Sequence, residues 1–217
     1  QTYGDAVTLA ANVTLAGTAV NTTSTVDGAG NSLTVAGNAT VGGAVSNVST
    51  YSVNGTAALG ADVSTTGTQT YLGAVTLSGG DHTLTGSTVN TTSTVDGGNA
   101  NLSIVGNATV GGAISNVANY DVSGDATLGA NVTTSGTQSY GGLVTLDAST
   151  VTLNGTAGTF SQGIEGANNS LVLSFSGATS LDGSSFTNLD NLTTNGGGTT
   201  YLNGTIQTTG TQTYEDA

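Results

Sequence analysis

The sequence predicts an all-β protein, a right-handed parallel β-helix (β-solenoid). Three observations predict this fold. A long unit is repeated three times along the chain, a shorter period lies inside it, and that period alternates apolar and polar residues in short pieces. A fixed repeat in this size range indicates a stacked or tandem architecture. Helix fits poorly, because Gly makes up 35 of 217 residues and helical spacing is not sustained.

The long repeat is marked by the motif Gln-Thr-Tyr, which begins at Gln1, Gln69 and Gln212 and returns as Gln-Ser-Tyr at Gln138. Both ends of the chain fall at the same phase of this repeat, as expected for a window of a longer array or for a processed fragment. We therefore expect one continuous solenoid over 1–217, made of repeats 1–68, 69–137 and 138–211 and the start of a fourth at 212–217.

The short period defines the expected rungs. Lines of sequence that begin at Leu33 and Tyr51 align without a gap, apolar over apolar and Gly over Gly. Line starts are spaced about 23 residues apart on average, which predicts about three rungs per 69-residue repeat and nine in all. Period-two alternation broken by Gly, Asn and Asp predicts short strands joined by tight turns. Parallel crossovers are right-handed in nearly all cases, hence the predicted hand.

Stacking of equivalent strands predicts specific neighbours and a specific interior. Leu33 should lie beside Tyr51, Val41 beside Leu59, and Val45 beside Val63. The expected interior residues are Val7, Leu9, Val35, Val41, Val53, Leu59, Val75, Leu77, Leu102, Ile104, Val110 and Leu146. The alternative, a string of three small β-sandwiches, would have unusually short domains and leaves the short period unexplained.

Composition excludes several classes of partner. The chain has no Lys or Arg, 13 acidic residues and one His, for a formal charge of −13. Recognition of nucleic acid and attraction to anionic lipid both depend on Lys and Arg. No apolar run approaches the ~18 residues that span a bilayer, so we expect no direct membrane insertion. Cys is absent, which removes disulfides, thiolate zinc sites and Cys nucleophiles.

Three phrases carry a resemblance to a known family: Thr65–Leu77, Ser24–Gly28 and Thr199–Gly204. They resemble the repeats of filamentous-haemagglutinin-like bacterial adhesins and related giant β-strand-repeat surface exoproteins, and the resemblance covers the whole chain. It implies a secreted or cell-surface β-helical fibre, extracellular in location, that acts in adhesion or builds extracellular matrix. Surface glycans are a further expected partner.

We therefore expect a structural, non-enzymatic segment without catalytic, cofactor or metal residues. One alternative is a carbohydrate- or ice-binding module on a flat Thr/Asn face, with rows such as Thr66, Thr68 and Thr70. The second is a tailspike-like glycan hydrolase, which needs a pair of carboxylates. Its candidates in the third repeat are Asp147, Glu165, Asp182 and Asp190.

Other polar motifs have a structural and a functional interpretation. His82, beside Asp81, is expected to be a turn residue at a corner of the solenoid rather than a catalytic or metal-binding residue. Asp27-Gly28, Asp96-Gly97 and Asp182-Gly183 are expected to recur at one turn position, with calcium binding as the alternative. Asn-x-Ser/Thr occurs 13 times, which leaves surface glycosylation open; examples are Asn12, Asn38, Asn54, Asn107 and Asn203.

The last expected partner is the protein itself. The final coil around Gln212-Thr213-Tyr214 offers an open parallel edge, which is a template for adding strands. A head-to-tail contact of this kind does not close, so the sequence predicts end-to-end stacking along a filament.

Overall fold

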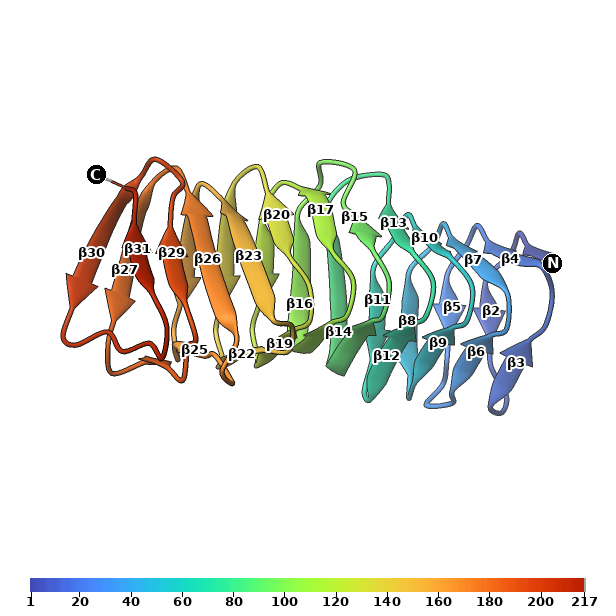
Figure 1. The fold of residues 1–217 in the computed structure, drawn as a ribbon. Coiled ribbons are helices and arrows are strands. Elements are labelled where there is room, and N and C mark those ends of the chain that lie inside the picture. The colour runs from blue at the N-terminus through green and yellow to red at the C-terminus, as the bar shows by residue number, and fades with distance from the viewer. Residues whose placement is uncertain (217) are drawn as a thin grey trace.

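The computed structural model describes residues 1–216 and consists of short parallel β-strands coiled around one axis, with no helix in this range. The coil is a rod with the two termini at opposite ends (Figure 1). Strand ladders cross the repeat boundaries, since Val132 of the second repeat pairs with Leu153 of the third. The chain is therefore a β-solenoid and not a string of sandwiches. The right-handed sense remains a prediction.

Each turn places its strands on three faces in succession. The first face is one twelve-stranded sheet: β1 (Thr2–Tyr3), β4 (Ala19–Thr22), β7 (Asn38–Val41), β10 (Ala57–Leu59), β13 (Val75–Leu77), β15 (Val95–Asp96), β17 (Ile114–Val117), β20 (Val132–Thr134), β23 (Thr150–Gly155), β26 (Ser170–Phe175), β29 (Leu192–Thr194) and β31 (Gln212–Tyr214).

The second and third faces are joined by two long strands, β14 (His82–Thr91) and β16 (Leu102–Val110), which run from one face onto the other. The second face also contains β2 (Val7–Thr8), β5 (Val26–Asp27), β8 (Val45–Val48), β11 (Val63–Thr65), β18 (Tyr120–Val122), β21 (Thr137–Tyr140) and β24 (Ala157–Phe160), followed by the pair β27 (Ala178–Asp182) and β30 (Thr199–Asn203). The third face also contains β3 (Val13–Leu15), β6 (Leu33–Val35), β9 (Tyr51–Val53), β12 (Thr68–Tyr71), β19 (Ala126–Leu128), β22 (Val144–Leu146), β25 (Ile164–Glu165) and β28 (Phe186–Thr187).

The predicted strand neighbours are confirmed: Leu33 pairs with Tyr51, Val41 with Leu59, and Val45 with Val63. The predicted number of rungs is wrong. The chain makes about 11 turns instead of nine. The predicted spacing was too long because it compared the lines that start at Val7 and Leu33, which lie on different faces. The strand partner of Val7 is Val26, and that of Leu33 is Val13.

One long repeat does not contain a whole number of turns. About 11 turns are shared by three repeats, so each repeat covers about three and two-thirds turns. Equivalent residues consequently move to a different face in each repeat. Tyr3 lies on the first face, Tyr71 on the third and Tyr140 on the second, and Tyr214 returns to the first. Three repeats are thus the smallest block that restores the same orientation.

The inward side chains of all three faces form one continuous apolar core. Every predicted interior residue is buried except Val7, which is half-buried in the first turn and packs against the core. Each fully buried Val or Leu contributes about 1.5–3 kcal/mol relative to an exposed one. The core is thin, but each turn covers the apolar side chains of the turn below it. Burial between successive turns therefore stabilises the core along the whole rod.

Candidate functional site

Asn and Asp side chains tie neighbouring turns together at the corners of the coil. Asn38 Oδ1 accepts the backbone N–H of Thr56 at 2.9 Å, in the next turn. The same contact recurs from Asp62 to Thr83, Asn107 to Asp125, Asp125 to Leu143, Asn131 to Thr152 and Asn191 to Thr211. The side-chain oxygen replaces the carbonyl acceptor that the strand ladder lacks at a corner. Much of the Asn and Asp content therefore has a structural role.

An acid–amide clasp is made of a carboxylate, the backbone N–H two residues later and an Asn of the next turn. It occurs at one equivalent position in each repeat and once more at Asp182, with Ser184 and Asn203. Asp27 Oδ1 accepts the N–H of Ala29 at 2.9 Å and Nδ2 of Asn47 at 3.1 Å. These bonds, the one from Ala29 first, lower the pKa of Asp27. The other equivalent clasps are Asp96 with Gly98 and Asn116, and Glu165 with Ala167 and Asn188.

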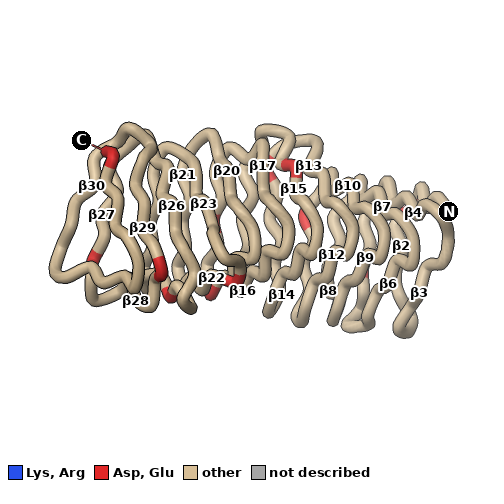
Figure 2. The backbone as a smooth tube through the Cα atoms, in the orientation of Figure 1, with Lys and Arg blue, Asp and Glu red and all other residues tan. Residues whose placement is uncertain are grey.

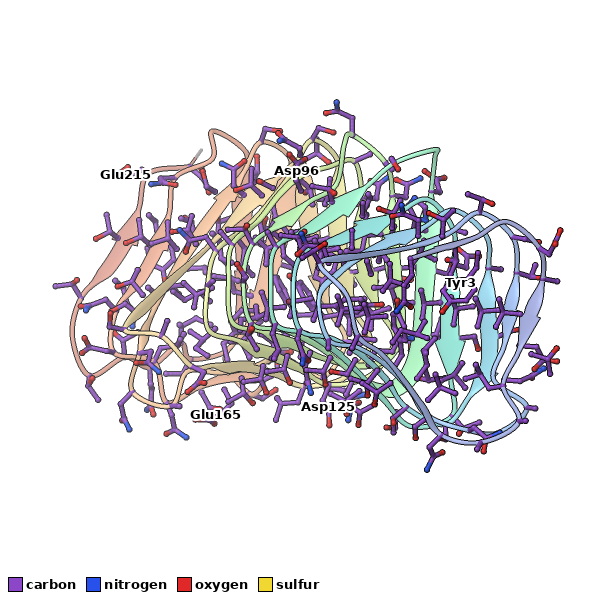
Figure 3. The ribbon with its side chains drawn as sticks, turned by 90° about the vertical axis from the view of Figure 1, so that its right-hand side faces the viewer. Tyr3, Asp96, Asp125, Glu165 and Glu215 are labelled. Carbon is purple, nitrogen blue, oxygen red and sulfur yellow. The ribbon has the colours of Figure 1, made fainter. Side chains whose placement is uncertain are left out.

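The three clasps at equivalent positions of the repeats lie on three different faces of the coil. Asp27, Asp96 and Glu165 lie on the second, first and third faces respectively. Asp96 and Glu165 therefore point away from opposite sides of the coil (Figure 3). Burial opposes ionisation of Glu165, but hydrogen bonds from Asn188, Ala167 and Thr187 outweigh it and lower the pKa. The clasps are separate structural contacts and not one shared site.

Asp182 was expected at the same turn position as Asp27 and Asp96. It makes the same kind of clasp, with Ser184 and Asn203, but Glu165 holds the equivalent position of the third repeat. Asp182 ends β27 and accepts from the backbone N–H and hydroxyl of Ser184 at 2.9 and 2.7 Å, which lower its pKa. Over residues 1–216, no group of three or more His, Asp or Glu residues is placed to hold a metal ion. The clasp carboxylates accept N–H donors of their own turn and of the next turn, which gives them a structural role.

The four hydrolase candidates differ in the contacts that their carboxylates make. Asp147 is exposed directly after β22, whereas Glu165 belongs to a clasp and Asp182 to the turn after β27. Asp190 accepts from Thr209 Oγ1 at 3.0 Å and from Asn191 Nδ2 at 2.8 Å. Three of the four therefore have structural hydrogen bonds of their own. Figure 2 shows acidic residues dispersed along the rod, with no basic residue.

We expected His82 to be a turn residue, and this prediction is wrong: His82 is a core residue. It begins β14, is only 4% exposed, and its Nε2 lies 2.9 Å from the carbonyl of Ser78. Its Nδ1 has no hydrogen-bond partner. The Asp81 carboxylate instead accepts the backbone N–H of Asn101 at 2.9 Å and its Nδ2 at 2.8 Å; the backbone bond, then the side-chain bond, lower its pKa. Asp81 and His82 thus do not form a catalytic pair.

Replacing His82 with Val is expected to raise the free energy of unfolding by about 1 kcal/mol, because it removes a buried nitrogen that lacks a partner. Val13 and Val151 occupy the equivalent position in the other repeats. The matched control is Val151→His, which should destabilise. Urea unfolding followed by circular dichroism measures both. A less stable His82→Val variant would mean that the bond to Ser78 outweighs the unpartnered nitrogen.

Stability is expected to decrease below about pH 4. The folded pKa values of Asp27, Asp81, Asp182 and Glu165 lie below their ordinary values of 3.8 (Asp) and 4.5 (Glu). Their stabilisation is therefore complete above these ordinary values and is lost as pH falls through the folded values. Thermal unfolding from pH 7 to pH 2 tests this. Asp27→Asn should weaken the dependence more than Asp5→Asn, which removes a charge without removing a clasp.

The predicted row Thr66, Thr68 and Thr70 lies only partly on one strand. Thr68 and Thr70 belong to β12, whereas Thr66 lies in the preceding corner. Thr70 belongs to a longer outward column of the third face, formed by Thr14, Thr34, Ser52, Thr70, Asn90, Thr109, Thr127 and Thr145. Beside its last members lies a groove of about 310 Å³, lined by Thr88, Asn107, Ala108, Thr109, Asp125, Ala126, Thr127, Leu143 and Thr145.

The example glycosylation sequons all have exposed Asn side chains. Asn12, Asn38 and Asn107 accept an N–H from the next turn through Oδ1. Asn203 instead donates Nδ2 to Asp182 at 3.1 Å, and Asn54 accepts from Ser52. Glycosylation of Asn203 would therefore disturb a contact between turns.

A buried Gln–Tyr unit was missed by the sequence analysis, which used the motif only as a repeat marker. Gln69 is fully buried, and its Nε2 donates to the carbonyls of Val63 at 2.9 Å and Thr85 at 2.8 Å. Tyr71 donates its hydroxyl to Gln69 Oε1 at 2.9 Å. Gln138 and Tyr140 form the same unit with the carbonyls of Val132 and Asn154. Pairing of Gln with Tyr two residues later was the available signal.

No helix in the described residues is long and apolar enough to cross a membrane. No protein-family model, curated protein or solved structure matches this chain.

Proposed function

We propose that the chain is a structural repeat segment of a secreted or cell-surface bacterial fibre, non-enzymatic and acting in adhesion or extracellular matrix. The observation that supports this most directly is the uninterrupted twelve-stranded sheet from β1 to β31. About 11 turns with a strand spacing of about 4.8 Å give a rod roughly 50 Å long. Length and periodicity are what such a fibre requires.

The polar chemistry of the rod supports the same proposal. Three of the four candidate carboxylates are hydrogen-bonded to the next turn, which suits a structural role. The dispersed negative charge keeps rods soluble and opposes their lateral association. The resemblance of the repeats to filamentous-haemagglutinin-like adhesins agrees with a bacterial surface location.

Antibodies against residues 1–217 test the location and the form of the protein. Immunogold electron microscopy of intact cells of the source organism should show label on extracellular fibres or on the cell surface. Brief treatment of intact cells with a broad-specificity protease should remove the label, because the protease reaches only protein outside the cell. Label confined to the cytosol would contradict the proposal.

A carbohydrate- or ice-binding module is the second candidate, favoured by the groove on the third face. The side chains of Thr109, Thr127 and Thr145 line this groove. The test combines a glycan array with an ice-recrystallisation assay on Thr109→Val/Thr127→Val. The matched control is Thr40→Val/Thr76→Val, two outward positions of the first face. Binding lost only in the third-face variant would support this candidate, and absence of binding by the unmodified protein would exclude the ligands tested.

A further inference from the structure

The two ends of the rod each contain half of a Gln–Tyr unit. In the interior, Gln69 Nε2 donates both to the preceding coil segment and to the following turn. Gln1 Nε2 makes only the forward bond, to the carbonyl of Ala16 at 2.8 Å. Gln212 Nε2 makes only the backward bond, to the carbonyl of Ile206 at 3.0 Å. One Gln placed between these two carbonyls would complete the interior pattern.

The strands that hold these halves occupy equivalent positions in the coil. β1 and β31 are the first and last strands of the same face, and each pairs on one side only, with β4 and β29 respectively. β31 lies where β1 of a following block of three repeats would lie. When two copies meet end to end, β1 of one copy and β31 of the other compete for the same place. Only one of these two strands can stay if β2 of one copy is to pair with β30 of the other.

The ends also expose complementary apolar surface. A hollow of about 240 Å³ opens at the N-terminal end and is lined mostly by apolar side chains, among them Tyr3, Val7, Val13 and Leu15. At the other end, Leu202 of β30 is 52% exposed although its partner in the preceding turn, Leu181, is buried. A further turn placed on β30 would cover Leu202 and close the hollow.

We propose that copies of this chain join head to tail by strand replacement, in which β1 of one copy displaces β31 of another. β31 is the displaced strand because its three residues are exposed, whereas Tyr3 of β1 packs against the core. Gln1 then donates to Ile206 of the other copy and to its own Ala16, and β2 pairs with β30. Such an open, heterologous contact produces filaments. The inference concerns copies of residues 1–217 and goes beyond the proposed function, because it states which strands form the contact between copies.

Removal of residues 212–217 tests the replacement, because it deletes the competing strand. Sedimentation velocity over a concentration series should show that the shortened chain associates at a concentration at least ~10-fold lower than the full chain does. Association of both should increase with salt, because screening weakens repulsion between acidic chains. A shortened chain that keeps its β-type circular dichroism yet associates no more tightly than the full chain would overturn the proposal.

Thiol cross-linking of the full chain tests the contact itself and does not depend on the shortened variant. The chain has no Cys, and Thr8 and Tyr201 are exposed on strands at opposite ends of the rod. Thr8→Cys/Tyr201→Cys should form a ladder of disulfide-linked multimers on oxidation. The control, Thr8→Cys/Thr109→Cys, moves the second thiol to the middle of the rod and should not. Equal cross-linking of both variants would mean side-by-side contacts, and no ladder in either would also reject the proposal.

Discussion

Replacing Tyr140 with Ala should lower the free energy of unfolding by about 4 kcal/mol, as expected when a large aromatic side chain is deleted from a closely packed interior. Tyr140 is fully buried. Its ring stacks on that of Phe160, with 5.5 Å between the ring centroids, and meets the ring of Tyr120 edge-on, with 6.0 Å between the centroids. Its hydroxyl donates to Gln138 at 3.0 Å. The substitution thus removes both ring packing and the partner of a buried amide oxygen.

Two further variants separate these contributions. Tyr140→Phe keeps the ring and leaves Gln138 Oε1 without its donor, so we expect a loss of about 1–3 kcal/mol. Tyr201→Ala removes a ring that is 60% exposed and should change stability by less than about 0.5 kcal/mol. Urea unfolding followed by far-UV circular dichroism gives all three values. A loss with Tyr201→Ala as large as with Tyr140→Ala would mean that position in the core does not decide the effect.

The architecture could be predicted because period-two alternation and repeated Gly, Asn and Asp turns leave few other folds open. Ladder partners such as Leu33 and Tyr51 followed from alignment of neighbouring lines. The number of turns did not follow, because all three faces carry the same alternation. A sequence line on one face therefore aligns well with a line on another. The rung length becomes evident only from pairings such as Val7 with Val26.

The polar residues were harder to assign for a related reason. Asp182 and Glu165 both make a clasp like that of Asp27, and Glu165, not Asp182, holds the equivalent position in its repeat. All clasp acids precede a Gly and have an Asn one turn later, so a search for Asp-Gly alone misses Glu165. His82 was placed in a turn because Gly79 and Gly80 precede it, whereas alignment past that insertion puts it at a buried Val position.

Replacing Gly106 with Ala is expected to lower the free energy of unfolding by about 3 kcal/mol or more. Gly106 lies in β16 at the corner between the second and third faces and has a φ of 131°, which side-chain-bearing residues rarely adopt. A Cβ there would also overlap the carbonyl oxygen of Gly86 in the preceding turn. Relief of the overlap would separate two turns, and Gly106 itself accepts a backbone bond from Gly124 in the turn that follows.

Gly4→Ala is the matched control, because a Cβ at Gly4 meets nothing within 4 Å. We expect it to unfold at the urea concentration of the parent, whereas Gly106→Ala unfolds earlier. Gly37, the equivalent of Gly106 in the first repeat, has the same close approach to a carbonyl, that of Gly17, and its Ala variant should also be destabilised. If Gly106→Ala is as stable as Gly4→Ala, the corner can move apart at little cost, and close contact between turns does not explain the high Gly content.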